Sequence, residues 1–307
     1  MIGLASARAA VDGIIATGRS APVLFYGAIG AGKSLLAERL ALAWLCPKAS
    51  QDGPCGECQV CRTFLDKGKA IDLQRIEPLG PSRIIRVGQI VPDSALDWEG
   101  TAVTTFLQTL PTVGRNRVVL IEDADRMNQD AANALLKTLE EASARARLIL
   151  TTSAISRVMP TIRSRCIAIA CELPGYDELA GQFASLEPHE LLFSEGAPGV
   201  IHHVREADEA YRTLFALFED LSGAPPGAAL VLSERFKEAA EALEKPTGQT
   251  SRACHAEALR CLALWIRSRM PGHPDRLAAV VETHRRIVGN ASANLAFDPL
   301  FATLVGP

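Results

Sequence analysis

A glycine-rich segment near the amino terminus contains the residue types that bind phosphate. The run Gly27-Ala28-Ile29-Gly30-Ala31-Gly32-Lys33-Ser34 fits the pattern G-x-x-x-x-G-K-[ST], and it lies between an apolar run and a helical pattern. In such a loop the backbone N–H groups surround an anion, the lysine reaches the outer phosphates, and the serine can bind Mg²⁺. A loop that is kept for packing and no longer supports turnover would fit the same pattern. The candidate nucleotide-binding residues are Gly27, Gly30, Gly32, Lys33 and Ser34.

Two acidic residues follow a second apolar run, at 118–121. In P-loop enzymes this position holds the magnesium ion and orients the attacking water, usually with Asp before Glu. Here the order is Glu122 and then Asp123. The extra methylene of Glu122 shifts its carboxylate by about 1.5 Å, and a displacement of that size can lower a rate roughly a hundredfold. We therefore expect a degenerate acidic pair; acids that only make the end of a strand polar are the alternative.

Four cysteines lie directly after the helical pattern that follows the glycine-rich loop. Their spacing is C-x8-C-x2-C-x2-C. A C-x-x-C unit presents two thiolates to one ion, and four thiolates complete the tetrahedral shell of Zn²⁺ and leave no open position. We expect a structural zinc site in an insert at 46–61; an iron–sulfur cluster and free or redox-active thiols are the alternatives. The proposed ligands are Cys46, Cys55, Cys58 and Cys61, whereas Cys166, Cys171, Cys254 and Cys261 are expected to be buried thiols.

The elements that must position these residues alternate between strand and helix. Strand-like apolar runs at 22–26, 118–121 and 148–150 are separated by helical patterns at 34–45 and 128–142. This alternation is typical of a parallel sheet with crossover helices.

The chain changes character after about residue 170. One more short β-like run, at 166–171, precedes Pro174 and Gly175, and the patterns beyond are helical. We expect an α/β domain at 1–170, a small helical domain at 171–207 and an all-helical domain at 208–307.

Composition and charge exclude several classes of protein. The net charge of −3 is unlike that of a basic nucleic-acid-binding protein. The sequence contains neither an apolar run long enough for a membrane helix nor a signal-peptide pattern at residues 1–21. We expect a cytoplasmic protein without a membrane partner, whose thiols stay reduced.

The motifs taken together resemble those of the bacterial clamp-loader AAA+ family of DNA polymerase III. The resemblance covers residues 1 to about 205, and it rests on the glycine-rich loop, the four-cysteine insert, NALLKTLEE at 133–141 and Ser164-Arg165-Cys166. It implies a P-loop AAA+ domain with a parallel sheet, a small helical lid and an all-helical collar. The implied partners are the other clamp-loader subunits of a hetero-pentamer, the sliding clamp and primed DNA. The proline at 92 and the segment 92–100 have no counterpart in this resemblance.

Within that family the chain is similar to delta-prime subunits. Gly199 stands where the lid of ATP-hydrolysing gamma subunits has its second-sensor arginine. The resemblance implies that Arg165 is an arginine finger for a neighbouring subunit's nucleotide, and that Thr152 belongs to the first sensor; an arginine in an ordinary surface ion pair is the alternative for Arg165. It therefore implies a subunit that helps to load the sliding clamp on primed DNA, with weak or no ATPase activity of its own. ATP and Mg²⁺ as cofactors, and a gamma-type or other ATP-hydrolysing AAA+ subunit, remain open.

Overall fold

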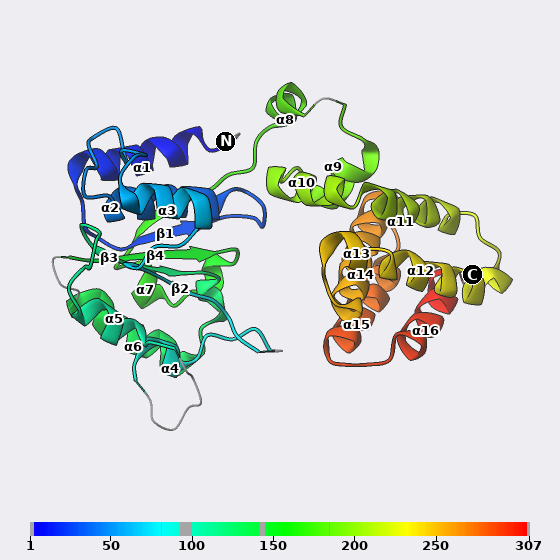
Figure 1. The fold of residues 1–307 in the computed structure, drawn as a ribbon. Helices are drawn as coiled ribbons and strands as arrows, with labels where there is room; N and C mark the ends of the chain where they lie inside the picture. Colours follow the sequence, from blue (N-terminus) through cyan, green and yellow to red (C-terminus); the bar gives the residue numbers. More distant parts are fainter. Residues whose placement is uncertain (1–2, 81, 93–99, 142–144, 184, 306–307) are drawn as a thin grey trace. The chain divides into compact units, whose positions relative to one another are not determined.

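The computed structural model describes residues 3–80, 82–92, 100–141, 145–183 and 185–305 (Figure 1). The chain divides into two compact units, Met1–Gly175 and Tyr176–Pro307. Most of the segment 92–100, which has no counterpart in the resemblance, lies outside the described residues.

The first unit is built on a parallel sheet of five strands in the order β2-β3-β4-β1-β5. In β1, which lies between β4 and β5, Val23 pairs with Ile149 on one side and with Ile167 on the other. Because the paired strands are parallel, their carboxyl ends lie at one edge of the sheet, and the expected α/β fold is confirmed. The strands are β1 (Val23–Tyr26), β2 (Leu73–Ile76), β3 (Arg117–Ile121), β4 (Ala146–Thr152) and β5 (Ile167–Ala170).

Helices cover both faces of this sheet (Figure 1). Alternate residues of β1 point to opposite faces: Val23 and Phe25 pack with the first helices of the chain, and Leu24 packs with the later ones. A strand that is buried on both faces needs apolar residues throughout, which explains the apolar run. The helices are α1 (Ala5–Thr17), α2 (Lys33–Leu45) and α3 (Gln59–Lys67), then α4 (Val87–Ile90), α5 (Val103–Gln108), α6 (Gln129–Glu141) and α7 (Pro160–Arg163), with short 3₁₀ turns η1 (Ala124–Arg126) and η2 (Ile155–Arg157).

The second unit is helical in the part of the chain that the structure describes. Its core is one apolar cluster in which Phe218, Phe236 and Trp265 are almost fully buried. Phe193 and Val204, from the expected lid, belong to the same cluster, and the division into lid and collar near residue 207 stays a prediction. The helices are α8 (Tyr176–Gln182), α9 (Pro188–Ser194), α10 (Pro198–Glu206), α11 (Asp208–Leu221), α12 (Ala229–Glu241), α13 (Glu244–Thr247), α14 (Ser251–Arg269), α15 (Pro274–Val288) and α16 (Ala293–Val305), with the 3₁₀ turn η3 (Pro226–Ala228).

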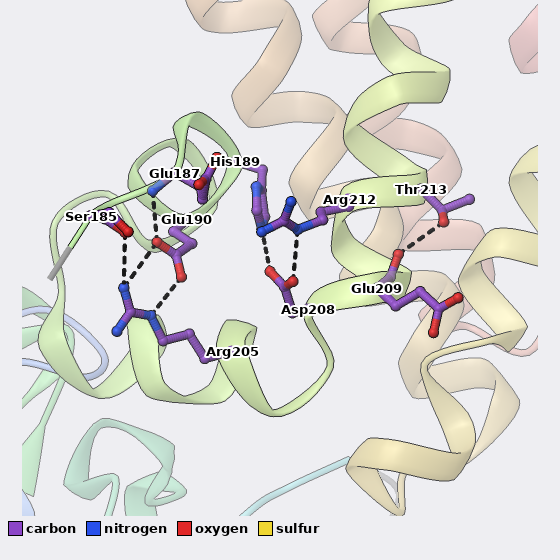
Figure 2. Close-up of polar contacts among 9 residues, drawn as sticks. All are labelled: Ser185, Glu187, His189, Glu190, Arg205, Asp208, Glu209, Arg212 and Thr213. Atoms are coloured by element: carbon purple, nitrogen blue, oxygen red, sulfur yellow. Dashed lines mark hydrogen bonds and ion pairs between the residues drawn. The ribbon is translucent and has the colours of Figure 1, made fainter. Parts of the chain in front are cut away.

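Two groups of charged residues join the first helices of this unit (Figure 2). Glu190 of α9 accepts a 2.6 Å bond from Nε of Arg205 in α10. The buried ring of His189 lies 2.8 Å from Asp208 at the start of α11, and Arg212 binds the other oxygen of the same carboxylate at 2.7 Å. These contacts tie α9 to α10 and to α11. No helix of the described part is long and apolar enough to cross a membrane.

Candidate functional site

The candidate phosphate-binding loop connects β1 to α2 at the carboxyl edge of the sheet. Gly27, Gly30 and Gly32 have φ angles of 152°, 75° and 91°, a region that side chains disfavour. A Cβ on Gly27 would come within 2.2 Å of the carbonyl oxygen of Cys171, so no other residue fits there without a backbone shift. No side chain caps the first turn of α2, so its N–H groups are not used by a cap, and the exposed Ser34 lies in that turn. The loop therefore has the geometry for an anion.

Lys33 is held at this loop by three hydrogen bonds. Its Nζ donates to the carbonyl oxygens of Gly27 and Ala28, at 2.9 and 2.7 Å, and to Oγ of Ser153 at 3.1 Å. Burial lowers the pKa of the lysine, against the attraction of nearby acidic groups that include Asp123. The side chain is 8% exposed, and its ammonium group is fixed where β1 and β4 end.

The two acidic residues after β3 are turned to different partners. Arg75 of β2 reaches both Glu122, at 3.0 Å, and Glu38 of α2, at 2.6 Å. Asp123 has a left-handed backbone, with φ of 49°, and forms a 3.5 Å ion pair with Arg83. The carboxylate that would stand in the magnesium position is thus paired with an arginine that also binds the helix of the phosphate loop.

Thr152, for which the resemblance implies a sensor role, is fully buried at the end of β4. Its hydroxyl donates to Asp125 at 2.6 Å and accepts from the N–H of Ala154 at 3.0 Å. Asp125 is a residue that the sequence interpretation missed. The pattern Glu-Asp-Ala-Asp at 122–125 could have pointed to Asp125, because it places a third acid two residues after the acidic pair.

Arg165 lies just after α7, away from the loop residues in the sequence. Its guanidinium forms a 2.5 Å ion pair with Glu140 of α6 and donates to the carbonyl oxygen of Thr161 at 3.0 Å. The side chains of Arg165 and Glu140 are 39% and 51% exposed. An exposed ion pair of this kind contributes only about 0–1 kcal/mol, so the arginine can change partner at little cost.

The four cysteines of the insert come together in space. Zn–S bonds of about 2.3 Å in a tetrahedron put neighbouring sulfurs about 3.8 Å apart. The Sγ atom of Cys46 lies 3.6 Å from that of Cys55 and 3.8 Å from that of Cys58, and the sulfurs of Cys55 and Cys61 are 4.0 Å apart. All four fall within 4.8 Å of one another. The donor set and its spacing fit a four-thiolate metal site.

The local backbone supports this cluster. Cys58 is the N-cap of α3 and accepts a hydrogen bond from the N–H of Cys61 at 3.5 Å, and Cys55 accepts one from the N–H of Cys58 at 3.4 Å. Backbone N–H groups, of Glu57 first and then Cys58, lower the pKa of Cys55 to about 6. A thiolate is the form that binds a metal, and these N–H groups stabilise it.

Gly199, which the resemblance matches to the second-sensor arginine of gamma subunits, lies in the first turn of α10, where Pro198 is the first residue. A glycine has no side chain with which to reach a phosphate. The contact between Arg205 and Glu190 engages the arginine at the other end of the same helix.

Comparisons with known proteins place this geometry in a family. The model of a family described as DNA polymerase III, delta subunit, matches residues 9–173. The chain is 43% identical over 152 residues to the DNA polymerase III subunit delta' of Pseudomonas aeruginosa, a match that covers 50% of this chain and 43% of that protein. It is 31% identical over 194 residues to the subunit tau/gamma of Haemophilus influenzae, covering 63% of this chain and 26% of that protein. The chain therefore spans less than half the length of either relative.

One solved structure resembles the chain along almost its whole length. It is a DNA polymerase III, gamma subunit-related protein from Thermotoga maritima, with a TM-score of 0.48 and 17% identity over 97% of this chain and 98% of that one. At that TM-score the likeness carries no argument about function.

Proposed function

This chain belongs to the DNA polymerase III clamp-loader family and is of the delta-prime type, and we propose that it is a non-motor subunit of a sliding-clamp loader. Its partners in this proposal are the other loader subunits of a hetero-pentamer, the sliding clamp and, through the assembly, primed DNA. Residues 1–170 supply the AAA+ domain, residues 171–207 the lid, and residues 208–307 the collar through which the subunits associate.

The pairing of Glu122 with Arg75 carries the non-motor part of the proposal. A magnesium-dependent hydrolase needs a carboxylate that is free to hold the metal and another that orients water. Here Glu122 is engaged by the half-buried guanidinium of Arg75, whereas Asp123 forms only an exposed 3.5 Å pair with Arg83. The loop around Lys33 supports nucleotide binding, whereas the acidic residues do not support rapid hydrolysis. Binding and turnover are therefore separated in this subunit.

Arg165 carries the second part of the proposal. An arginine finger must be exposed, fixed in charge and able to leave its resting partner, because it acts on a phosphate that another subunit holds. Arg165 is exposed, and its partner Glu140 is itself on the surface. In the assembled loader, Arg165 leaves Glu140 and contacts the terminal phosphate at a neighbour's site.

The test of this function is the variant Arg165→Ala in a loader reconstituted from the full set of subunits. Removal of a finger costs roughly 10³–10⁵ in rate at the one site that it serves. We therefore expect the loader's clamp-dependent ATP turnover to fall, with assembly on gel filtration unchanged. The matched control is Arg157→Ala, at an exposed arginine of η2, which should leave turnover unaltered. Equal turnover in the Arg165→Ala and wild-type loaders would remove Arg165 from this role.

The complete phosphate loop favours a second candidate, an ATP-hydrolysing subunit that uses Lys33 and Ser34 with the acids Glu122 and Asp123. Turnover by the purified chain distinguishes the two. If the chain is a non-motor subunit, it binds ATP through Lys33 and hydrolyses it slowly. Lys33→Ala then abolishes ATP binding and changes the low rate of turnover little. Rapid turnover that disappears in Lys33→Ala would support the motor subunit.

The cysteine cluster holds Zn²⁺ in this proposal, with Cys46, Cys55, Cys58 and Cys61 as ligands. The four thiolates leave no position for water, so the ion has a structural role. It cross-links the segment after α2 to the start of α3, and thereby fixes the insert between β1 and β2.

A further inference from the structure

A cavity of about 350 Å³ opens in the first unit, away from the phosphate loop. Its walls are the carboxyl-terminal ends of α1 and α2, the residues Arg115 and Asn116 just before β3, and Arg147 near the start of β4. The strands β3 and β4 begin beside this cavity, whereas the phosphate loop follows the last residue of β1. In a parallel sheet the two sites therefore lie at opposite edges.

The charge of this cavity is positive. Two arginines line it, Arg115 and Arg147, and among its described lining residues there is no Asp or Glu. The guanidinium of Arg147 lies 6.0 Å from the ring centroid of the buried Trp44. Burial first, and then the like charge of Arg115, lower the pKa of Arg147. One guanidinium nitrogen of Arg147 donates to the carbonyl oxygen of Ala146 at 2.8 Å, which holds the group at the cavity wall.

The backbone that carries Arg115 is fixed before any ligand arrives. The N–H of Arg115 donates to the carbonyl oxygen of Leu45 at 2.8 Å. The side-chain amide of Asn116 donates to the backbone carbonyl oxygen of Trp44 at 2.6 Å. The N–H of the preceding Gly114 donates to the buried carboxylate of Asp72 at 2.6 Å. A Cβ on Gly114 would lie 3.0 Å from the carbonyl oxygen of Leu45, so a larger residue there would crowd this contact. Such fixing reduces the ordering cost of binding.

We propose that this cavity binds a small multivalent anion of the phosphate class between the guanidinium groups of Arg115 and Arg147. Forked guanidinium donors match phosphate oxygens in pairs, and two adjacent cations are balanced by more than one negative charge. The volume is in the range of small-molecule sites, and it exceeds the need of a monatomic ion. Arg115 is exposed and Arg147 is half-buried, so the cavity is open to a ligand from solvent.

The experiment is a calorimetric titration of the full chain with pyrophosphate at constant ionic strength. It uses the Lys33→Ala background, which removes the phosphate loop as a competing site. We expect saturable binding with one ligand per chain, and a change in the fluorescence of Trp44 that Trp44→Phe removes. Arg147→Met and Arg115→Gln should each weaken binding by about tenfold or more, because each removes hydrogen bonds to a charged ligand.

The control is Arg62→Gln, which removes the same charge at an exposed position of α3 outside the cavity. It should bind pyrophosphate as tightly as its parent. Arg115 is exposed, so its substitution tests the site even if Arg147→Met fails to fold, which circular dichroism would reveal. Absence of saturable binding in Lys33→Ala would overturn the proposal, as would an Arg115→Gln variant that binds unchanged. So would a loss in Arg62→Gln equal to that in Arg115→Gln, since it would indicate non-specific attraction.

Discussion

Asp72 is a buried carboxylate that organises the segment before β3. It accepts backbone N–H bonds from Thr112, Val113 and Gly114 at 2.7, 2.8 and 2.6 Å, and lies 3.3 Å from Arg117. Burial alone would raise its pKa, but these N–H groups and then the guanidinium outweigh burial, so the pKa is below its usual value. The charged form is therefore the stabilising one.

This predicts a pH dependence of stability for Asp72→Asn. A carboxyl with a depressed folded pKa stabilises the protein above its unfolded pKa of about 3.9, and that contribution is lost as pH falls through the folded value. We expect the free energy of unfolding of the variant to be about 2 kcal/mol lower than that of the wild type at neutral pH. On acidification, the free energy of unfolding should fall less in the variant than in the wild type. Urea unfolding at several pH values measures both. The exposed Asp66→Asn is the control, and parallel acid profiles in Asp72→Asn and wild type would contradict the assignment.

Arg75 yields a prediction about magnesium. While it binds Glu122, that carboxylate is not free for a metal. In Arg75→Met we expect Mg²⁺ to strengthen ATP binding more than it does in the wild type. The control is Glu38→Gln, which leaves the bond from Arg75 to Glu122 in place and should behave like the wild type. Fluorescent-nucleotide titration with and without Mg²⁺ measures this, and an unchanged magnesium effect in Arg75→Met would show that Glu122 has no latent metal role.

At the scale of elements, the cysteine insert should depend on its metal for folding. Metal-binding free energy in a structural zinc site is folding free energy. We expect about one zinc per chain, and we expect chelation or Cys58→Ser to expose the segment 46–67 to proteolysis while the sheet stays folded. Elemental analysis and limited proteolysis are the measurements. Cys166→Ala, outside the cluster, should keep its zinc; a protein that resists proteolysis equally after metal removal would exclude a structural role.

The sequence predicted elements where one physical signal was strong. The doubly buried strands β1, β3 and β4 are apolar runs, and the cysteine spacing is set by local geometry. The strand β2 was not apparent because it reads Leu-Gln-Arg-Ile and three of its four residues are only half-buried. The fork of Arg75 to Glu38 and Glu122 could not be predicted, since it joins residues 37 and 47 positions away that only the fold brings together. The same reason hid the bond of Asp125 to Thr152.

At the scale of the molecule, each unit has apolar core clusters of its own. Among the residues that the structure describes, the cluster around Phe236 and Trp265 draws on the second unit alone, and the clusters on both faces of the sheet draw on the first. We expect two calorimetric transitions. Phe236→Ala should lower mainly the transition temperature of the second unit, and Leu40→Ala mainly that of the first. Each change should reduce the free energy of unfolding of its unit by a few kcal/mol, as is usual for large-to-small core changes. A single transition that both variants shift equally would mean that the units unfold as one.

The fork of Arg75 also constrains how this chain can diverge. One guanidinium is shared by two carboxylates on different elements, so loss of Arg75 leaves two like charges facing each other, whereas loss of either glutamate leaves a balanced pair. Interactions of this kind are non-additive. A variant that lost Arg75 would carry two repelling glutamates, and a short acid placed at position 122 would still face Arg75. We therefore expect Arg75 to be retained wherever Glu38 and Glu122 are both present.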